Sequence, residues 1–212
     1  MKKFILMIIA ITSYAGNSHA QETGVRSRLL FGMKGGLNYS NVYDSQGENF
    51  YTNPKLGLAG GVFLAIPFGK YLGIQPEVLF SQKGFRATGE VYGSNYRFTR
   101  TTSYIDMPLY FSFKPSEFLT LMAGPQIAYL LHQRDVFSNS TLTVETQNEF
   151  KNNNVRKNTL GFTGGVDINL NHIVLGARAG WDVQKNNGDG SSTNPRYKNV
   201  WYQATIGYQF YN

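Results

Sequence analysis

The sequence predicts an all-β protein: an eight-stranded, antiparallel, up-and-down transmembrane β-barrel with short periplasmic turns and long outer loops. Three features lead to this prediction. Eight segments alternate between apolar and polar or small residues, and alternation over segments of about ten residues is typical of transmembrane strands. The connections between these segments are alternately long and short. The chain also begins with a segment that is typical of secretion signals.

Residues 1–20 contain the parts of a cleavable signal peptide. Lys2 and Lys3 precede an apolar run of sequence FILMIIAI, and small residues, Ser18 and Ala20, stand at the positions that a signal peptidase reads. The run is far shorter than the ~20 residues that a transmembrane helix needs. We therefore predict a signal peptide at 1–20, a short periplasmic lead-in at 21–28, and an outer-membrane β-barrel domain at 29–212.

The first half of the predicted barrel contains strands at 29–41, 56–66, 72–83 and 98–113. Successive side chains of a strand point to opposite faces, so alternate residues share a face. The opposite faces carry mainly glycine and small polar residues, together with a few charges such as Lys83. The apolar faces include Leu37 and Tyr39 in the first strand, Leu58 and Val62 in the second, Val78 and Phe80 in the third, and Leu109 and Phe111 in the fourth.

The second half contains strands at 119–132, 159–170, 173–184 and 199–212. The last strand alternates most regularly, with Tyr202, Ile206 and Tyr208 on its apolar face and Gln203 and Gln209 opposite. Proline removes a ladder hydrogen bond, so local irregularities or bulges are expected within three strands. These prolines are Pro76, Pro108 and Pro125.

The connections define the topology of the predicted barrel. Those at 67–71, 114–118 and 171–172 are short and rich in turn-forming residues, whereas those at 42–55, 84–97, 133–158 and 185–198 are long and polar. Outer-membrane barrels have short periplasmic turns and long outer loops, so both termini are expected in the periplasm. Alternation within 141–144 predicts that the fifth and sixth strands continue as a hairpin beyond the membrane.

Alternation alone leaves open which face points inward. A soluble barrel places its apolar face inside, whereas a membrane barrel places it outside. The second arrangement is favoured here because the polar faces are dominated by small residues, which fit the narrow interior of eight strands. Aromatic residues also lie near many strand ends, as expected for interface girdles. The absence of cysteine excludes disulfides as a source of stability.

Several motifs resemble the small outer-membrane barrels of Bacteroidota, known as porin-family or PorT-like proteins. The most specific is Gly73–Gly84 (GIQPEVLFSQKG); GGLNYSN from Gly35, YIDMPL from Tyr104 and AGP from Ala123 are weaker. The resemblance implies an outer-membrane location, and for PorT-like proteins an association with secretion of surface proteins. It also implies that Gly207, Tyr208 and Phe210 form an assembly signal that the barrel-assembly machinery reads.

Six charged residues share the parity that we assign to the barrel interior. A buried charge is costly unless it is paired, so these residues are expected to form ion pairs that fill the lumen. A narrow path for ions or small solutes is the alternative function for this set. The candidate lumen charges are Lys34, Glu77, Asp106, Asp167, Arg178 and Asp182.

A second alternative is a lipid-modifying enzyme at the outer rim. His132 lies at the end of the fifth strand, close in sequence to Asp135, Ser138 and Ser140, and a histidine near an acid and a hydroxyl is the minimum for acyl transfer. The sequence shows proximity only. It contains no GxSxG motif, no metal-ligand cluster and no nucleotide-binding fingerprint, so no cofactor is expected.

The main expectation from the sequence is a non-enzymatic barrel with a structural, surface-interaction or secretion-associated role. Its partners would be outer-membrane lipids and lipopolysaccharide, the assembly machinery, and a possible secretion or surface protein, but not nucleic acid. Lipopolysaccharide phosphates could bind cations in or beside the outer loops. These cations are Arg86, Arg97, Arg100, Arg134, Lys151, Arg156 and Lys157.

Overall fold

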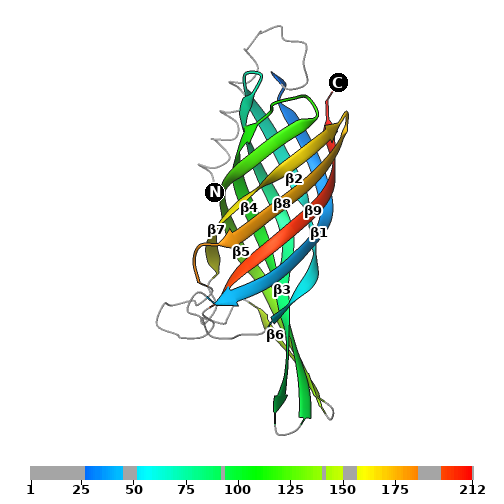
Figure 1. The fold of residues 1–212 in the computed structure, drawn as a ribbon, viewed down its shortest axis with the longest axis vertical. Coiled ribbons are helices and arrows are strands. Elements are labelled where there is room, and N and C mark those ends of the chain that lie inside the picture. The colour runs from blue at the N-terminus through cyan, green and yellow to red at the C-terminus, as the bar shows by residue number, and fades with distance from the viewer. Residues whose placement is uncertain are drawn as a thin grey trace.

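The computed structural model describes residues 27–44, 52–91, 94–139, 142–149, 157–185 and 197–211. They form one antiparallel sheet of nine strands (Figure 1). No helix in these segments is long and apolar enough to cross a membrane. The strands are β1 (Leu30–Asp44), β2 (Thr52–Phe68), β3 (Leu72–Val91), β4 (Ser94–Phe113), β5 (Leu119–Asn139), β6 (Thr143–Glu149), β7 (Asn158–Leu170), β8 (Ile173–Asp182) and β9 (Tyr197–Phe210).

Eight of the strands close into a ring, as the sequence predicts. The order β4-β3-β2-β1-β9-β8-β7-β5 is completed by pairing of β4 with β5, and β6 adds to the outer part of β5. The first and last strands pair from Phe31 opposite Phe210 to Asp44 opposite Tyr197. This pairing removes the two sheet edges, whose backbone groups could not be left unbonded in lipid.

The apolar faces of the strands point outward and the polar faces point inward. On β9, Trp201, Gln203 and Gln209 are buried, whereas Tyr202 is 61% exposed and Ile206 is 58% exposed. The aromatic residues that the sequence places near strand ends, such as Phe111 and Phe210, are likewise exposed on the outer surface. A soluble barrel would show the opposite burial, so the alternative of a soluble ligand-binding barrel is wrong.

Two predicted loops are largely strand. The prediction of a long loop at 84–97 is wrong, because β3 continues to Val91 and β4 begins at Ser94. The hairpin predicted within 133–158 is present, formed by the end of β5 and by β6. Figure 1 shows these strands projecting beyond the barrel, at the end away from the C-terminus. We call the part formed by 84–91, 94–102, 132–139 and 142–149 the projecting sheet.

The projecting sheet reverses the alternation of the barrel, and this explains the error. Several of its inward side chains are apolar: Phe85 and Ala87 form a cluster with Val42, against which Phe98 and Tyr197 pack. Its outward side chains include arginines on β3, β4 and β5. These strands therefore leave the lipid and enter water, where an apolar face is buried inside and a polar face is solvated. The outward arginines are Arg86, Arg97 and Arg134.

The three prolines at which the sequence predicts irregularities do not shift the strand registers. Pro76, Pro108 and Pro125 all lie within strands, and the registers shift instead between Pro54 and Ala59 and between Ser103 and Tyr104. Residues 1–26 lie outside the described residues, so the signal peptide and most of the lead-in stay predictions.

Replacement of Gly180 by alanine should destabilise the barrel. Gly180 faces the lumen, and an added Cβ would lie 2.4 Å from Cζ2 of the buried Trp201. Overpacking of this kind costs roughly 1–3 kcal/mol. We expect a lower urea midpoint for unfolding from bilayers. Gly35→Ala is the control, because its Cβ would meet nothing within 4 Å. Equal midpoints for the two variants would contradict the interior packing described above.

Candidate functional site

The barrel interior holds all six predicted lumen charges. Each side chain comes from the inward face of its strand, and none is more than 9% exposed. The structure brings four of them into one ion-pair group and places the other two, Asp106 and Asp182, apart from it. The six residues are Lys34 on β1, Glu77 on β3, Asp106 on β4, Asp167 on β7, and Arg178 and Asp182 on β8.

The first group is centred on Glu77 and Arg178. Glu77 lies 2.5 Å from the Lys34 ammonium and 3.9 Å from Arg178, and Arg178 forms a 2.7 Å ion pair with Asp167. Gln75 donates a 2.8 Å hydrogen bond to Glu77. Two cations thus face two carboxylates, and a buried charge of either sign has an opposite charge nearby. This pairing is the condition under which buried ions are tolerated.

A second group lies nearer the projecting sheet and contains a residue outside the predicted set. Lys83 forms a 2.8 Å ion pair with Asp106, and its ammonium lies 3.7 Å from the centroid of a Trp201 ring. Tyr104 lies on another side, 5.1 Å from the same ammonium. The sequence contained the information needed to predict Lys83 as a lumen charge, because alternation places it on the same inward face of the third strand as Glu77.

Asp182 is bound by amide donors. Its carboxylate accepts hydrogen bonds from the Asn199 side-chain amide at 2.6 Å and from the Asn199 backbone N–H at 3.3 Å. Both residues lie at the outer end of the lumen, on the neighbouring strands β8 and β9. The sequence placed Asp182 inside the barrel, but a count of charges could not show that its partner is neutral.

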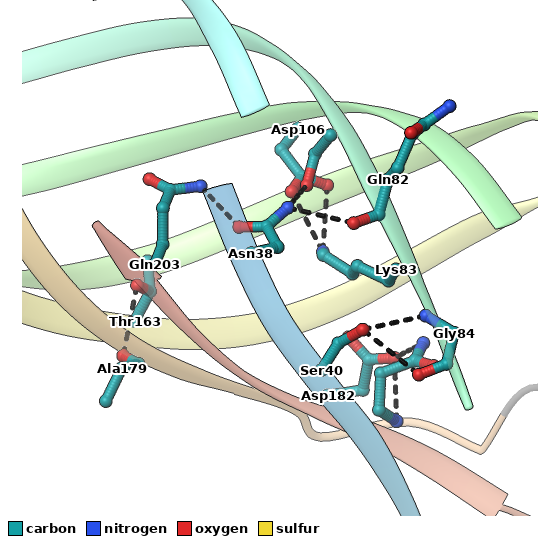
Figure 2. A network of polar contacts seen from close by, with 12 residues as sticks. Asn38, Ser40, Gln82, Lys83, Gly84, Asp106, Thr163, Ala179, Asp182 and Gln203 are labelled. Atoms are coloured by element: carbon teal, nitrogen blue, oxygen red, sulfur yellow. Dashed lines mark hydrogen bonds and ion pairs between the residues drawn. The ribbon is translucent and has the colours of Figure 1, made fainter. Parts of the chain in front are cut away.

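A chain of neutral hydrogen bonds fills the space between these charges (Figure 2). Gln203 on β9 donates to Asn38 on β1 at 2.9 Å, and Asn38 donates to Ser81 on β3 at 2.8 Å. Ser40 accepts from the Gly84 backbone N–H at 2.8 Å. Side chains of β1 and β3, which are not neighbours in the sheet, are therefore linked inside the barrel.

A third polar group lies at the outer end of the lumen, beyond the lipid-facing band. Arg100 forms two 2.7 Å hydrogen bonds with Asp135 and donates to the Tyr197 hydroxyl at 2.8 Å. Phe85 and Phe98 surround this pair. Burial raises the pKa of Tyr197, and the Arg100 charge opposes that change without reversing it. The phenol therefore stays protonated, and the group forms a layer of aromatic side chains around a paired charge.

The described residues near His132 do not form the arrangement needed for an enzyme. His132 lies opposite Ser103 in the register of β4 and β5, whereas Asp135 lies opposite Arg100 and so points to the other face of β5. The Asp135 carboxylate is bound by Arg100, and the Ser138 hydroxyl is 3.1 Å from Thr143. Ser140 lies outside the described residues. Among the residues that are described, no group of three metal-ligating side chains occurs.

The predicted assembly signal lies at the closing seam. Gly207 lies beside Lys34, where an added Cβ would come within 3.1 Å of the lysine Cβ, and Phe210 stacks on Phe31 with ring centroids 5.8 Å apart. Tyr211, beyond the last strand, stacks on His172 at 4.3 Å, and Tyr208 lies 5.3 Å from the same ring. These contacts attach the C-terminal residues to the neighbouring strand and turn. Their recognition by the assembly machinery stays a prediction.

A closed ring of strands with an apolar exterior and a paired-charge interior defines a class, the integral β-barrels of bacterial outer membranes. The family model described as "Outer membrane protein beta-barrel domain" matches residues 19–181. The chain therefore belongs to this family and is located in the outer membrane.

Solved structures show similar small barrels. The attachment invasion locus protein Ail of Yersinia pestis is 15% identical, with 85% of this chain and 98% of that chain covered and a TM-score of 0.48. Neisserial surface protein A is 11% identical, with coverages of 85% and 97% and a TM-score of 0.46. The N-terminal barrel domain of Pseudomonas aeruginosa OprF is 11% identical, with the same coverages and a TM-score of 0.39. A search of curated proteins gave no match.

The Lys83–Asp106 pair can be tested by a double-mutant cycle. Lys83→Met keeps the length of the side chain but leaves Asp106 buried without its cation, and this should cost about 3–5 kcal/mol. Adding Asp106→Asn removes the unpaired charge and should restore a large part of the loss. The free energy of unfolding of both variants is measured by urea titration, with the folded fraction read from the mobility shift on SDS–PAGE of unheated samples. Strict additivity of the two substitutions would contradict a direct ion pair.

Proposed function

We propose that this protein is a non-enzymatic outer-membrane barrel with a lumen plugged by its own side chains, and that its role is structural or surface-interacting. The observation that carries the proposal is the continuous set of paired charges and hydrogen bonds across the interior. Eight strands enclose a space that side chains just fill, whereas diffusion porins use about 16 strands.

The projecting sheet supports a role outside the cell. Among the described residues it is the largest structure beyond the lipid-facing band, and the Arg100–Asp135 pair and the aromatic cluster beneath it connect its strands. Binding surfaces are commonly carried by such extensions on a stable scaffold. We propose lipopolysaccharide, surrounding outer-membrane lipids and a surface or secreted protein as the partners to be tested, with the barrel-assembly machinery acting during insertion.

A narrower assignment also belongs to this proposal. The motifs at Gly73–Gly84 and near the chain end support membership of the PorT-like group of Bacteroidota, and hence a secretion-associated role. Co-purification from native membranes tests this role. Recovery of a stoichiometric secretion component would support it, and recovery of the barrel alone from membranes in which the secretion system is assembled would contradict it.

A narrow channel is the competing function for the lumen charges. The closed-lumen proposal expects no stable conductance from the purified barrel in planar bilayers. Arg178→Ala removes the cation shared by Glu77 and Asp167, so it should lower the stability of the barrel. Neither the wild type nor this variant should show a stable conductance. A stable wild-type conductance that shifts in Arg178→Ala would overturn the plugged-lumen proposal.

The enzymatic alternative has a direct test as well. His132 points away from Asp135, so His132→Ala should leave lipid A structure and phospholipid turnover unchanged in cells that express the protein at normal levels. Mass spectrometry of extracted lipids measures both. Loss of a lipid modification in His132→Ala, with the barrel still folded, would require a catalytic role.

A further inference from the structure

The outward face of the projecting sheet is cationic and rich in hydroxyl groups. Arg86 lies opposite Thr99, Thr88 lies opposite Arg97, and Arg97 also lies opposite Ser138 on the next strand. Residues directly opposite in an antiparallel pair share a face, so these side chains lie together. We call this surface the cationic face; it comprises Arg86, Thr88, Arg97, Thr99, Thr101, Arg134, Val136 and Ser138, with Glu145 beside Val136 on β6.

Two of its three arginines are available to a ligand. Arg86 and Arg97 are exposed diagonal neighbours, and no side chain that the structure describes forms an ion pair with either. Arg134 is already bound by Glu145 through two hydrogen bonds of 2.8 Å. Adjacent like charges repel, so an anion that bridges Arg86 and Arg97 would relieve that repulsion.

The height of the cationic face distinguishes between two sources of anions. Leu72 and Phe113 stand at the periplasmic ends of the lipid-facing rows of β3 and β4, and Arg86 and Arg97 lie 14 and 16 positions from them along the strands. A strand rises about 3.3 Å per residue and is tilted by about 40°, so the two arginines stand about 35 Å and 40 Å from that edge, which is about 10 Å and 15 Å beyond an apolar band about 25 Å tall. The head-group layer is only about 5–8 Å thick on each side of a bilayer. The face therefore reaches past the lipid phosphates into the zone of surface saccharides.

An open hollow adjoins Arg97 at the tip of the sheet. Its volume is about 650 Å³. Hydroxyl and amide groups with one aromatic ring suit a sugar, because sugars present many hydroxyl groups and apolar C–H faces. The hollow is lined by Thr88, Gly89, Asn95, Tyr96, Arg97, Ser138 and Asn139.

We propose that the cationic face binds an anionic glycan chain outside the membrane. Arg86 and Arg97 contact its carboxylate, sulfate or phosphate groups, and the hollow beside Arg97 accommodates a sugar ring. The proposal rests on the surface-interaction role given above and specifies the chemical class of the partner. It also assigns the partner to the saccharide zone rather than to lipid head groups.

Binding is tested with the full barrel in nanodiscs of zwitterionic phosphatidylcholine, with dextran sulfate as the probe and neutral dextran as the reference. We expect binding of dextran sulfate only, weakened by salt. Arg86→Gln together with Arg97→Gln should weaken binding by about tenfold, because two charge-assisted contacts are lost. Lys70→Gln with Arg28→Gln removes the same charge at the opposite end of the barrel and should change affinity by less than about twofold.

A gain of affinity provides an independent arm. Glu145→Gln removes the acid that binds Arg134 and adds a free cation to the same face, so affinity should rise severalfold. Equal loss of affinity in the Arg86/Arg97 double variant and in the Lys70/Arg28 double variant would overturn the proposal, as would no gain in Glu145→Gln. So would stabilisation by phosphatidylglycerol in the nanodisc that disappears in the arginine double variant, because the anion would then be a lipid. A closed lumen with no glycan binding would reject this inference and leave the plugged barrel intact.

Discussion

The structure depends on one constraint: hydrocarbon provides no partner for a backbone polar group or a charge. Pairing of β1 with β9 satisfies the backbone, since every strand of the ring then has two neighbours. The same constraint explains the period-two pattern. Apolar side chains occupy the positions that face lipid, and Lys34, Lys83 and Arg178 occupy positions where the barrel itself supplies a carboxylate.

The interior is a packed core made of polar atoms. Ion pairs alone would not fill it, and neutral side chains such as Asn38 and Gln203 connect distant strands between them. Glycine provides room for the largest side chains: Gly180 lies against Trp201, and Gly32 lies against Phe63. Buried ions of this kind contribute little net stability relative to an apolar core, but loss of one partner is expensive. The arrangement therefore favours one register and one closed shape.

Beyond the membrane the solvent changes, and the chemistry of the two faces is exchanged. Phe85 and Phe98 turn inward around Arg100 and Asp135, while Arg86 and Arg97 turn outward. The barrel thus continues as a soluble sheet without any break in the strands. A water-exposed polar surface follows directly from this exchange.

The alternation of inward and outward positions along each strand made the barrel and its interior residues largely predictable from the sequence. The inward position of Glu77, Arg178 and the other predicted charges follows from alternation alone. Which charges meet does not follow, because register and shear decide whether Lys83 reaches Asp106 or Asp182. The extension of β3 and β4 was missed because a strand in water shows the opposite phase of the same pattern. Proximity of His132 to Asp135 in sequence was misleading, since an odd spacing places them on opposite faces.

The central claim is that the lumen is dry and filled. The chain has no cysteine, so the labelling of a single introduced cysteine can be measured without labelling elsewhere in the protein. Ser81 and Thr163 are buried inward residues whose replacement by cysteine is conservative, and exposed Thr88 on the projecting sheet provides an accessible reference. With a charged methanethiosulfonate reagent on intact membranes, the account predicts rapid modification of the cysteine at position 88. It predicts no modification at position 81 or 163 until the barrel is denatured. Rapid modification at 81 and 163 in the folded protein would show a water-filled lumen and contradict the account.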